Sequence, residues 1–325
     1  MGSILGLHGL CGAGIDMKLW MLILGVCAFM NTAIAGQKPE FDSLWNYDNP
    51  AETEAKFREL LPGARRSGDT GLLVELTSQI ARTLGLRQKF AEAHALLDST
   101  LPLLDAAGKR ARVRYLLERG RTFNSSKMQE KAVPLFTEAW SRAQEAGYDF
   151  HAVDAAHMLA IATPAAEHME WNQKAISIAE KSKDAKARNW LGSLYNNIGW
   201  DFFDQKKFES AREMFEKALG ARVEQKKLAE IRIAKWCIAK TLRKLGKADS
   251  ALVVQQQLEK EWRDSGEEQD GYVFEELGEC LLALDRRDES QSYFARAYEF
   301  LSRDPWLTRD EPDRLQRLKE LGKVE

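Results

Sequence analysis

Apolar positions recur at helical spacing over most of this chain. The clearest stretch runs over residues 195–218, where a first helix with bulky and small residues on one face is followed by a polar turn at residues 204–207. A second helix then carries Ala, Phe and Ala at the same spacing. The pattern predicts a helical hairpin, and the positions that define it are Tyr195, Ile198, Gly199, Phe202, Ala211, Phe215 and Ala218.

The same hairpin pattern occurs six times in a fixed register. Aligned on their small residues, the six hairpins start at residues 74, 113, 153, 192, 232 and 271, so that successive starts are 39 or 40 residues apart. A small residue lets the two helices of each hairpin approach closely, and a large apolar residue of the second helix fills the space between hairpins. The small residues are Ala81, Gly120, Ala160, Gly199, Ala239 and Gly278, and the clearest large ones are Phe136, Phe215 and Phe294.

This arrangement of an aromatic residue, a small residue, and then Ala, Phe and Ala resembles the tetratricopeptide repeat. The resemblance covers residues 74–302 and implies an all-α fold, a right-handed α-solenoid of stacked hairpins. The period is longer than the usual 34 residues of that family, and we interpret the extra residues as helices longer by about a turn. Two prolines disturb the pattern: Pro164 stands where the first helix of hairpin three should end, and Pro134 predicts a late start or a kink in the second helix of hairpin two.

Both flanks of the repeats have predictable elements. Residues 37–73 form an N-terminal segment, in which Asn49-Pro50 begins a helix over Ala51–Leu61. Residues 303–325 form a C-terminal capping helix with one apolar side, which a solenoid needs at its end. That side consists of Leu315, Leu318 and Leu321.

Residues 1–36 have the pattern of a leader. Lys18 is followed by an apolar run from Leu19 to Met30, and Ala33-Ile34-Ala35 provides small residues for a signal peptidase. We therefore expect export to the periplasm or the outside of the cell after cleavage near Ala35, with Met17 as a candidate for the true start. An uncleaved membrane anchor and a cytoplasmic protein remain alternatives.

Composition excludes several classes of protein. The 325 residues carry a net charge of −2, which argues against a nucleic-acid-binding protein. The basic run of residues 232–247 has acidic neighbours, so we interpret it as a solvated helix face. Of the four cysteines, Cys237 and Cys280 lie outside the leader, and the sequence leaves open whether they are linked. No phosphate loop, hydrolase motif or zinc motif is present, which predicts a chain that is not an enzyme and holds no cofactor or metal.

The resemblance also implies a concave groove lined by the first helix of each hairpin. Residues one, four and eight places after each start tend to face such a groove, and Arg, Lys, Asn and Trp at these places suit a peptide with acidic residues or a carboxylate. The acidic Glu275 and Glu279 close one end of the row. The predicted groove residues are Arg82, Arg114, Arg121, Asn124, His157, Asn196, Trp200, Trp236, Lys240 and Arg243.

Three functions follow from this reading. The favoured one is a non-catalytic scaffold or adaptor that binds a protein segment in the groove. A peptide- or ligand-sensing regulator is the first alternative. An enzyme with a site near His157 is the second, although the spacing of His151, His157 and His168 does not fit metal binding on one helix.

Overall fold

The computed structural model describes residues 41–324, and within this range the regular elements are all helical. The expected leader, its cleavage site and residues 37–40 lie outside the described residues. The elements are η1 (Phe41–Leu44), α2 (Pro50–Arg66), α3 (Thr70–Leu86), α4 (Phe90–Asp98), η2 (Leu101–Leu103), α5 (Lys109–Ser125), α6 (Gln129–Glu145), α7 (Asp149–Ala162), α8 (Ala165–Lys181), α9 (Ala185–Arg188), α10 (Leu191–Asp204), α11 (Phe208–Glu224), α12 (Leu228–Lys244), α13 (Ala248–Ser265), α14 (Gly271–Ala283), α15 (Arg287–Leu301), α16 (Pro305–Asp310) and α17 (Pro312–Gly322).

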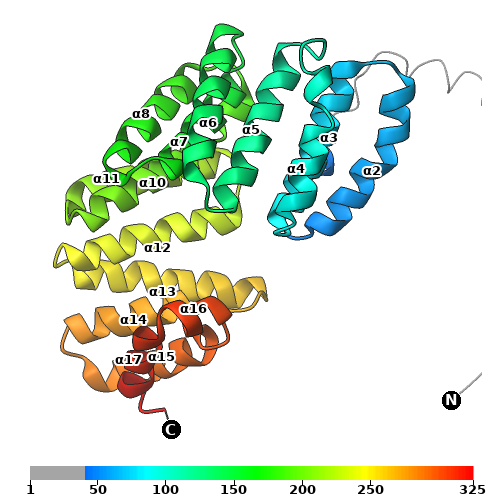
Figure 1. The fold of residues 1–325 in the computed structure, drawn as a ribbon. Helices are drawn as coiled ribbons and strands as arrows, with labels where there is room; N and C mark the ends of the chain where they lie inside the picture. Colours follow the sequence, from blue (N-terminus) through cyan, green and yellow to red (C-terminus); the bar gives the residue numbers. More distant parts are fainter. Residues whose placement is uncertain (1–40, 325) are drawn as a thin grey trace, which may run out of the picture.

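The helices follow one another along an arc, so that elements close in sequence are also close in space (Figure 1). Six antiparallel pairs make up the arc: α3 with α4, α5 with α6, α7 with α8, α10 with α11, α12 with α13, and α14 with α15. The first helix of each pair packs on its own partner and on the preceding hairpin. This is the stacking predicted for an α-solenoid.

Five of the six hairpins turn through a residue in the left-handed region. The turn residue has φ between 59° and 77° and follows the end of the first helix, where a positive φ ends a helix and reverses the chain. In the third hairpin Thr163 is extended and Pro164 begins the next helix, so that the proline does end α7 as predicted. The five left-handed residues are Gln88, Lys127, Lys206, Gly246 and Asp285.

In every second hairpin, a glycine of the first helix lies in close contact with a phenylalanine ring of the second helix. A Cβ atom on Gly199 would lie 2.5 Å from Cε1 of Phe215, and a Cβ on Gly120 would lie 2.5 Å from Cε1 of Phe136. Gly278 and Phe294 repeat the arrangement at 2.8 Å. The absence of a side chain on the first helix therefore provides the space that the ring of the second helix fills, as the residue pattern predicted.

The other hairpins replace this pair with alanine and an aliphatic residue. Ala81 and Leu97 are both fully buried in the first hairpin, and Ala160 and Ile176 stand in the same register in the third. In the fifth hairpin the residue at this place is Gln255, which is fully buried and whose amide makes no hydrogen bond to any described residue. A buried amide without a partner destabilises a fold, so Gln255 is a weak point of the core.

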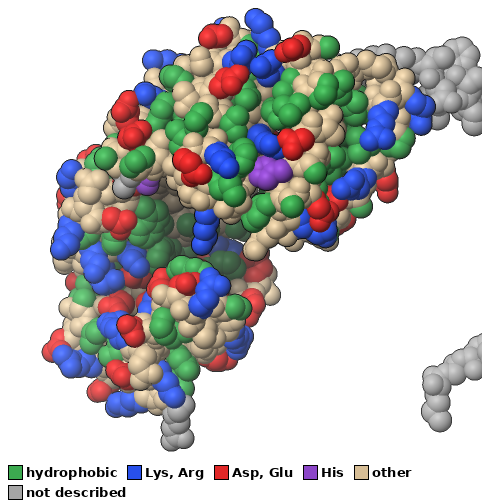
Figure 2. All heavy atoms as spheres, in the orientation of Figure 1, with side chains coloured by type: hydrophobic (Ala, Val, Ile, Leu, Met, Phe, Trp, Pro, Cys, Tyr) green, Lys and Arg blue, Asp and Glu red, His purple; other side chains and the backbone are tan. Residues whose placement is uncertain are grey.

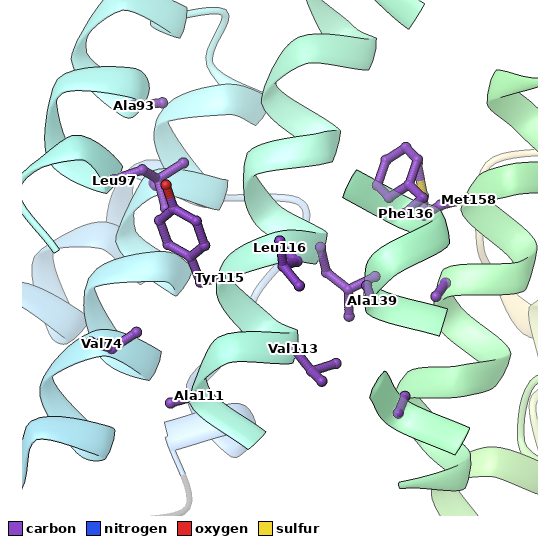
Figure 3. Packing of buried hydrophobic residues seen from close by; sticks show 14 of the residues in the cluster. Val74, Ala93, Leu97, Ala111, Val113, Tyr115, Leu116, Phe136, Ala139 and Met158 are labelled. Atoms are coloured by element: carbon purple, nitrogen blue, oxygen red, sulfur yellow. The ribbon is translucent and has the colours of Figure 1, made fainter. Parts of the chain in front are cut away.

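The core runs along the arc as several clusters. Figure 3 shows the first of them, in which side chains from α3 to α7 meet, among them Leu97, Leu116 and Phe136. Phe215 belongs to a different cluster, with Ala211 and Cys237, and Phe294 lies in the cluster near the C-terminus. Because the three phenylalanines do not share one centre, the molecule is not a compact bundle.

Several details differ from the sequence-based prediction. The first helices begin at residues 70, 109, 149, 191, 228 and 271, which are 37 to 43 residues apart, so the constant period of 39 or 40 is not confirmed at the level of helix starts. The short helix α9 is inserted before the fourth hairpin.

The prediction for Pro134 was wrong as to the start of the helix, since α6 begins at Gln129 and its eighth residue, Phe136, matches the eighth residues of α11 and α15.

Helix α2 is longer than predicted and fits the register of the repeats. It continues through Pro62 to Arg66. Its fully buried Phe57 lies 79 residues before Phe136, which itself lies 79 before Phe215, so α2 has the place of a second helix. Among the described residues, no glycine of a first helix faces the Phe57 ring. Instead, the rings of Phe41 and Trp45 contact it edge-on, with centroids 6.1 and 5.4 Å from the centroid of Phe57.

The C-terminal helix α17 covers the last hairpin. Leu315 and Leu318 are buried and Leu321 is half-buried, as predicted for a capping helix. Gly322 allows the close approach, because a Cβ there would lie 2.6 Å from the backbone nitrogen of Ala295 in α15.

The glycine–phenylalanine pair should behave as a unit. We expect Gly199→Ala alone to lower the free energy of unfolding by about 1–3 kcal/mol, because the new methyl group meets the Phe215 ring. Phe215→Leu in the same chain should recover roughly 1 kcal/mol of this loss, since the first hairpin already pairs Ala81 with Leu97. Urea unfolding of both single variants and the double variant measures the coupling. Gly220→Ala is the matched control: its exposed site in α11 is open, so this change should stabilise slightly.

The buried amide provides a second test. We expect Gln255→Leu to raise the free energy of unfolding by about 1–3 kcal/mol, because an unpaired polar group is replaced by the residue type of the equivalent position 97. Gln256→Leu, at an exposed neighbouring position, should change stability little. A destabilised Gln255→Leu variant in thermal or urea unfolding would contradict the assignment of Gln255 as an unsatisfied core residue.

Candidate binding face

The residues one, four and eight places after each hairpin start form a continuous row across the first helices. We call this row the inner face. Its members contact residues of neighbouring helices, and the inner face is taken to include these partners together with Asn124 and Arg243 one turn further on. Figure 2 shows that the arc encloses a hollow between its two arms, with hydrophobic side chains visible inside it.

The N-terminal part of the inner face is held together by ion pairs. Arg82 contacts Glu118 at 3.3 Å, and Arg121 contacts both Glu118, at 2.8 Å, and the carboxylate of Asp154 in α7. Arg114 pairs with Asp42 and lies 3.6 Å from Glu75. The predicted groove residues Arg82, Arg114 and Arg121 are therefore already paired with carboxylates of their own chain.

The electrostatics of this block favour the charged forms. Burial alone would raise the pKa of Asp154, but Arg121 and Arg82 lower it below its usual value. Burial likewise works against the charge of Arg121, yet the carboxylates of Asp154 and Glu118 raise its pKa. Their mutual charge compensation keeps these groups ionised inside the fold.

The C-terminal part of the inner face has a second set of ion pairs. Arg243 donates two hydrogen bonds to Glu276, at 2.9 and 2.7 Å, and Lys240 lies 3.5 Å from the same carboxylate. Burial would raise the pKa of Glu276, but Arg243 and Lys240 lower it. Helix α17 covers the acidic end, because Arg314 pairs with Glu275 and Arg317 with Glu279.

Aromatic contacts replace ion pairs between α10 and α12. The ring centroids of Trp200 and Trp236 are 6.1 Å apart, and Trp236 donates its indole N–H to the carbonyl oxygen of Tyr272 at 3.0 Å. The Cys237 thiol lies 3.7 Å from Oδ1 of Asn196. The structure thus brings Asn196, Trp200 and Trp236 together.

The two parts of the inner face meet between α7 and α10. The contact there is a ring contact between His157 and Trp190, with centroids 4.9 Å apart. Burial lowers the pKa of His157. Asn124, at the end of α5, is half-buried, and no hydrogen bond joins its side chain to another described residue.

Sequence reasoning overlooked two apolar residues of the inner face. Ile161 stands eight places after the third start and Ile233 one place after the fifth, so the same spacing rule selects them. Ile161 is 50% exposed and Ile233 is 53% exposed, which is unusual for isoleucine. They were missed because only polar and aromatic residues were considered as contacts.

Sequence reasoning also missed that the N-terminal segment contacts the inner face. Asp42 pairs with Arg114, and the indole N–H of Trp45 donates to Oε1 of Gln79 at 2.9 Å. These contacts place residues 41–47 against α3 and α5. One feature of the sequence could have predicted this contact. Phe57 of α2 lies 79 residues before Phe136, so α2 has the register of a second helix and the residues before it take the place of a first helix.

The cysteines, the possible metal ligands and the surface depressions also bear on the predictions. Cys237 and Cys280 are free and buried, and burial raises the pKa of each thiol to about 12. No group of His, Cys, Asp and Glu residues within the described range could hold a metal ion. Over the same range, no helix combines the length and the apolar character that a membrane span requires. A depression of about 220 Å³ between Leu104 and Glu145 contains none of the predicted groove residues.

His151 should contribute a pH dependence to stability. Burial and then the charge of Arg114 lower its pKa from 6.5 to about 4, so below pH 6.5 the unfolded chain binds a proton that the folded chain does not. Stability should therefore fall between pH 6.5 and 4. In His151→Phe, we expect the loss between these pH values to be smaller by about 1–3 kcal/mol. Urea unfolding at several pH values compares the slopes, and equal slopes in the two chains would exclude His151 as the cause.

Comparison with known proteins finds a family match for one of the hairpins. A profile described as tetratricopeptide repeat matches residues 191–224, which cover α10 and α11. No curated protein sequence matches the chain.

Solved structures share the fold. BtubC (BKLC) from P. vanneervenii has a TM-score of 0.54 and 15% identity, over 72% of this chain and 95% of that one. A Signal Transduction ATPase with Numerous Domains with a tetratricopeptide repeat sensor, PH0952 from Pyrococcus horikoshii, has a TM-score of 0.65 and 14% identity. That alignment covers 93% of this chain but 50% of PH0952. The hairpin of α10 and α11 thus matches the tetratricopeptide repeat, and the described residues share the α-solenoid fold of these solved structures.

Proposed function

We propose that this protein is a non-catalytic scaffold that binds a segment of a partner protein across the middle of its inner face, between α7 and α12. The observation that carries the proposal is the exposure of Ile161 and Ile233 on that face. Exposed isoleucines on the two helices that flank α10 offer apolar area to a guest, and contiguous area of this kind marks interaction surfaces.

The ends of the inner face are less suited to a guest. The side chains of Arg114, Arg121 and Arg243 are only 10, 15 and 12% exposed, and each has a carboxylate partner in the chain. A guest carboxylate would have to displace these partners. The predicted preference for acidic segments thus becomes secondary in the proposal, and apolar contact with the middle provides the main free energy of binding.

Two asparagines can orient the guest. The amide of Asn196 in the middle is engaged only by a long contact with the Cys237 thiol, and that of Asn124, at the end of α5, is not engaged by a described residue and could reach only a guest that extends beyond α7. A side-chain amide offers both a donor and an acceptor, so it can pair with the backbone of an extended segment whatever its sequence.

Two features of the inner face favour a non-catalytic role. The buried Cys237 thiol, with its raised pKa, stays protonated at neutral pH and is a poor nucleophile. The lowered pKa of His157 suits a packed ring, and its contact with Trp190 gives it a structural role. A sensing role remains the alternative, since the repeats of PH0952 are described as a sensor.

A displayed library of random peptides tests the proposal. We expect the unaltered chain to enrich binding segments, and Ile161→Asp together with Ile233→Asp to weaken the selected peptides at least tenfold. A buried carboxylate without a partner would oppose docking at both places.

Val253→Asp is the matched control. Val253 is 64% exposed on the second helix α13, so the same change there alters charge and exposed apolar area without touching the inner face. Loss of binding in the control but not in the isoleucine variants would place the guest elsewhere, and the proposal would be wrong.

A further inference from the structure

The N-terminal segment of residues 41–47 lies against the inner face like a bound peptide. It passes α3 and reaches α5, where its Asp42 pairs with Arg114 and its Phe41 ring lies under the Arg114 guanidinium, 5.3 Å from Cζ to the ring centroid. Arg114 is mostly buried, and its other carboxylate contact, Glu75, is also contacted by Arg110 at 2.9 Å. Asp42 therefore provides a negative charge that this basic site requires.

Aromatic rings form the second half of the contact. The rings of Trp45 and Tyr47 stack with centroids 4.8 Å apart, and Arg82 lies over both, at 5.7 and 5.5 Å. The Trp45 indole donates to Gln79, which itself donates to Glu118 at 3.2 Å. Cation–π contact and a directed hydrogen bond thus select an aromatic residue three places after the acidic one.

The attachment of the segment to α3 and α5 depends on side chains. Its backbone hydrogen bonds among the described residues run within the segment, as from Trp45 to Asp42, or to α2, as from Asn46 to Thr53. Tyr47 remains 58% exposed. A separate peptide with the same side chains could therefore make the same contacts.

We propose that Gln79, Arg82 and Arg114 form a binding site for a short segment with an acidic residue followed by an aromatic one, and that residues 41–47 occupy it as an internal ligand. An external segment of the same chemistry binds only by displacing the internal one. This goes beyond the proposed function, because the site lies on α3 and α5 and does not involve Ile161 or Ile233.

The test uses the full chain and a labelled peptide with the sequence of residues 41–49, FDSLWNYDN. Asp42→Asn with Trp45→Ala weakens the internal ligand and keeps Gln79, Arg82 and Arg114, while it also removes the contact of the Trp45 ring with Phe57. We expect this variant to bind the peptide at least tenfold more tightly than the unaltered chain by fluorescence anisotropy, because the competing segment is gone. Arg114→Ala, added to this double variant, should abolish the gain in affinity for the peptide.

The control peptide FNSLANYDN lacks the acidic and indole groups. Equal binding of both peptides, or no gain in the double variant, would overturn the proposal. Ile161→Asp and Ile233→Asp should leave peptide binding unchanged, which separates this site from the one in the middle of the inner face.

Hydrogen exchange in the unaltered chain provides a measurement that needs no substitution. Saturating FDSLWNYDN should accelerate exchange of the Trp45 and Asn46 amides, because the internal segment is released, whereas FNSLANYDN should not. Unchanged protection of these amides at peptide saturation would overturn the proposal even if the double variant failed to fold.

Discussion

The close approach of the two helices in each hairpin is the constraint on which this structure depends. In three hairpins a glycine leaves the space that a phenylalanine ring fills, in two others alanine stands in register with an aliphatic residue, and in the fifth it stands in register with Gln255. A hairpin built in this way still has an apolar side to cover, so the next hairpin must stack on it. The length of the arc and the division of its core into several clusters both follow from that requirement.

The polar inner face has a different character from one end to the other. Ion pairs join α3, α5 and α7, aromatic rings join α10 and α12, and further ion pairs join α12, α14 and α17. Because the charges compensate one another, the large number of cations on this face does not make it a basic surface. Ile161 on α7 and Ile233 on α12 lie on either side of the aromatic section around α10, and that is why the middle of the row is the better candidate for a guest.

Much of the fold could be predicted from the sequence, because burial selects residue types at a helical period. The small residues, Phe136, Phe215 and Phe294, and the turn at 204–207 are all placed as expected. The ion pairs could not be predicted, since they depend on which helices become neighbours. Residues such as Arg82 and Arg114 were taken as free for a guest, whereas Glu118 and Asp42 already bind them. The insertion of α9 also has no periodic signal.

The insertion of α9 has a mechanical consequence. On the inner face a ring contact between His157 and Trp190 connects α7 with the residue before α10, whereas an ion pair connects α5 with α7 and aromatic rings connect α10 with α12. The spacing of the hairpins also changes here, because α7 and α10 begin 42 residues apart. A guest that contacts both Ile161 on α7 and Ile233 on α12 spans this insertion, so its binding would favour one relative orientation of the hairpins on either side of α9.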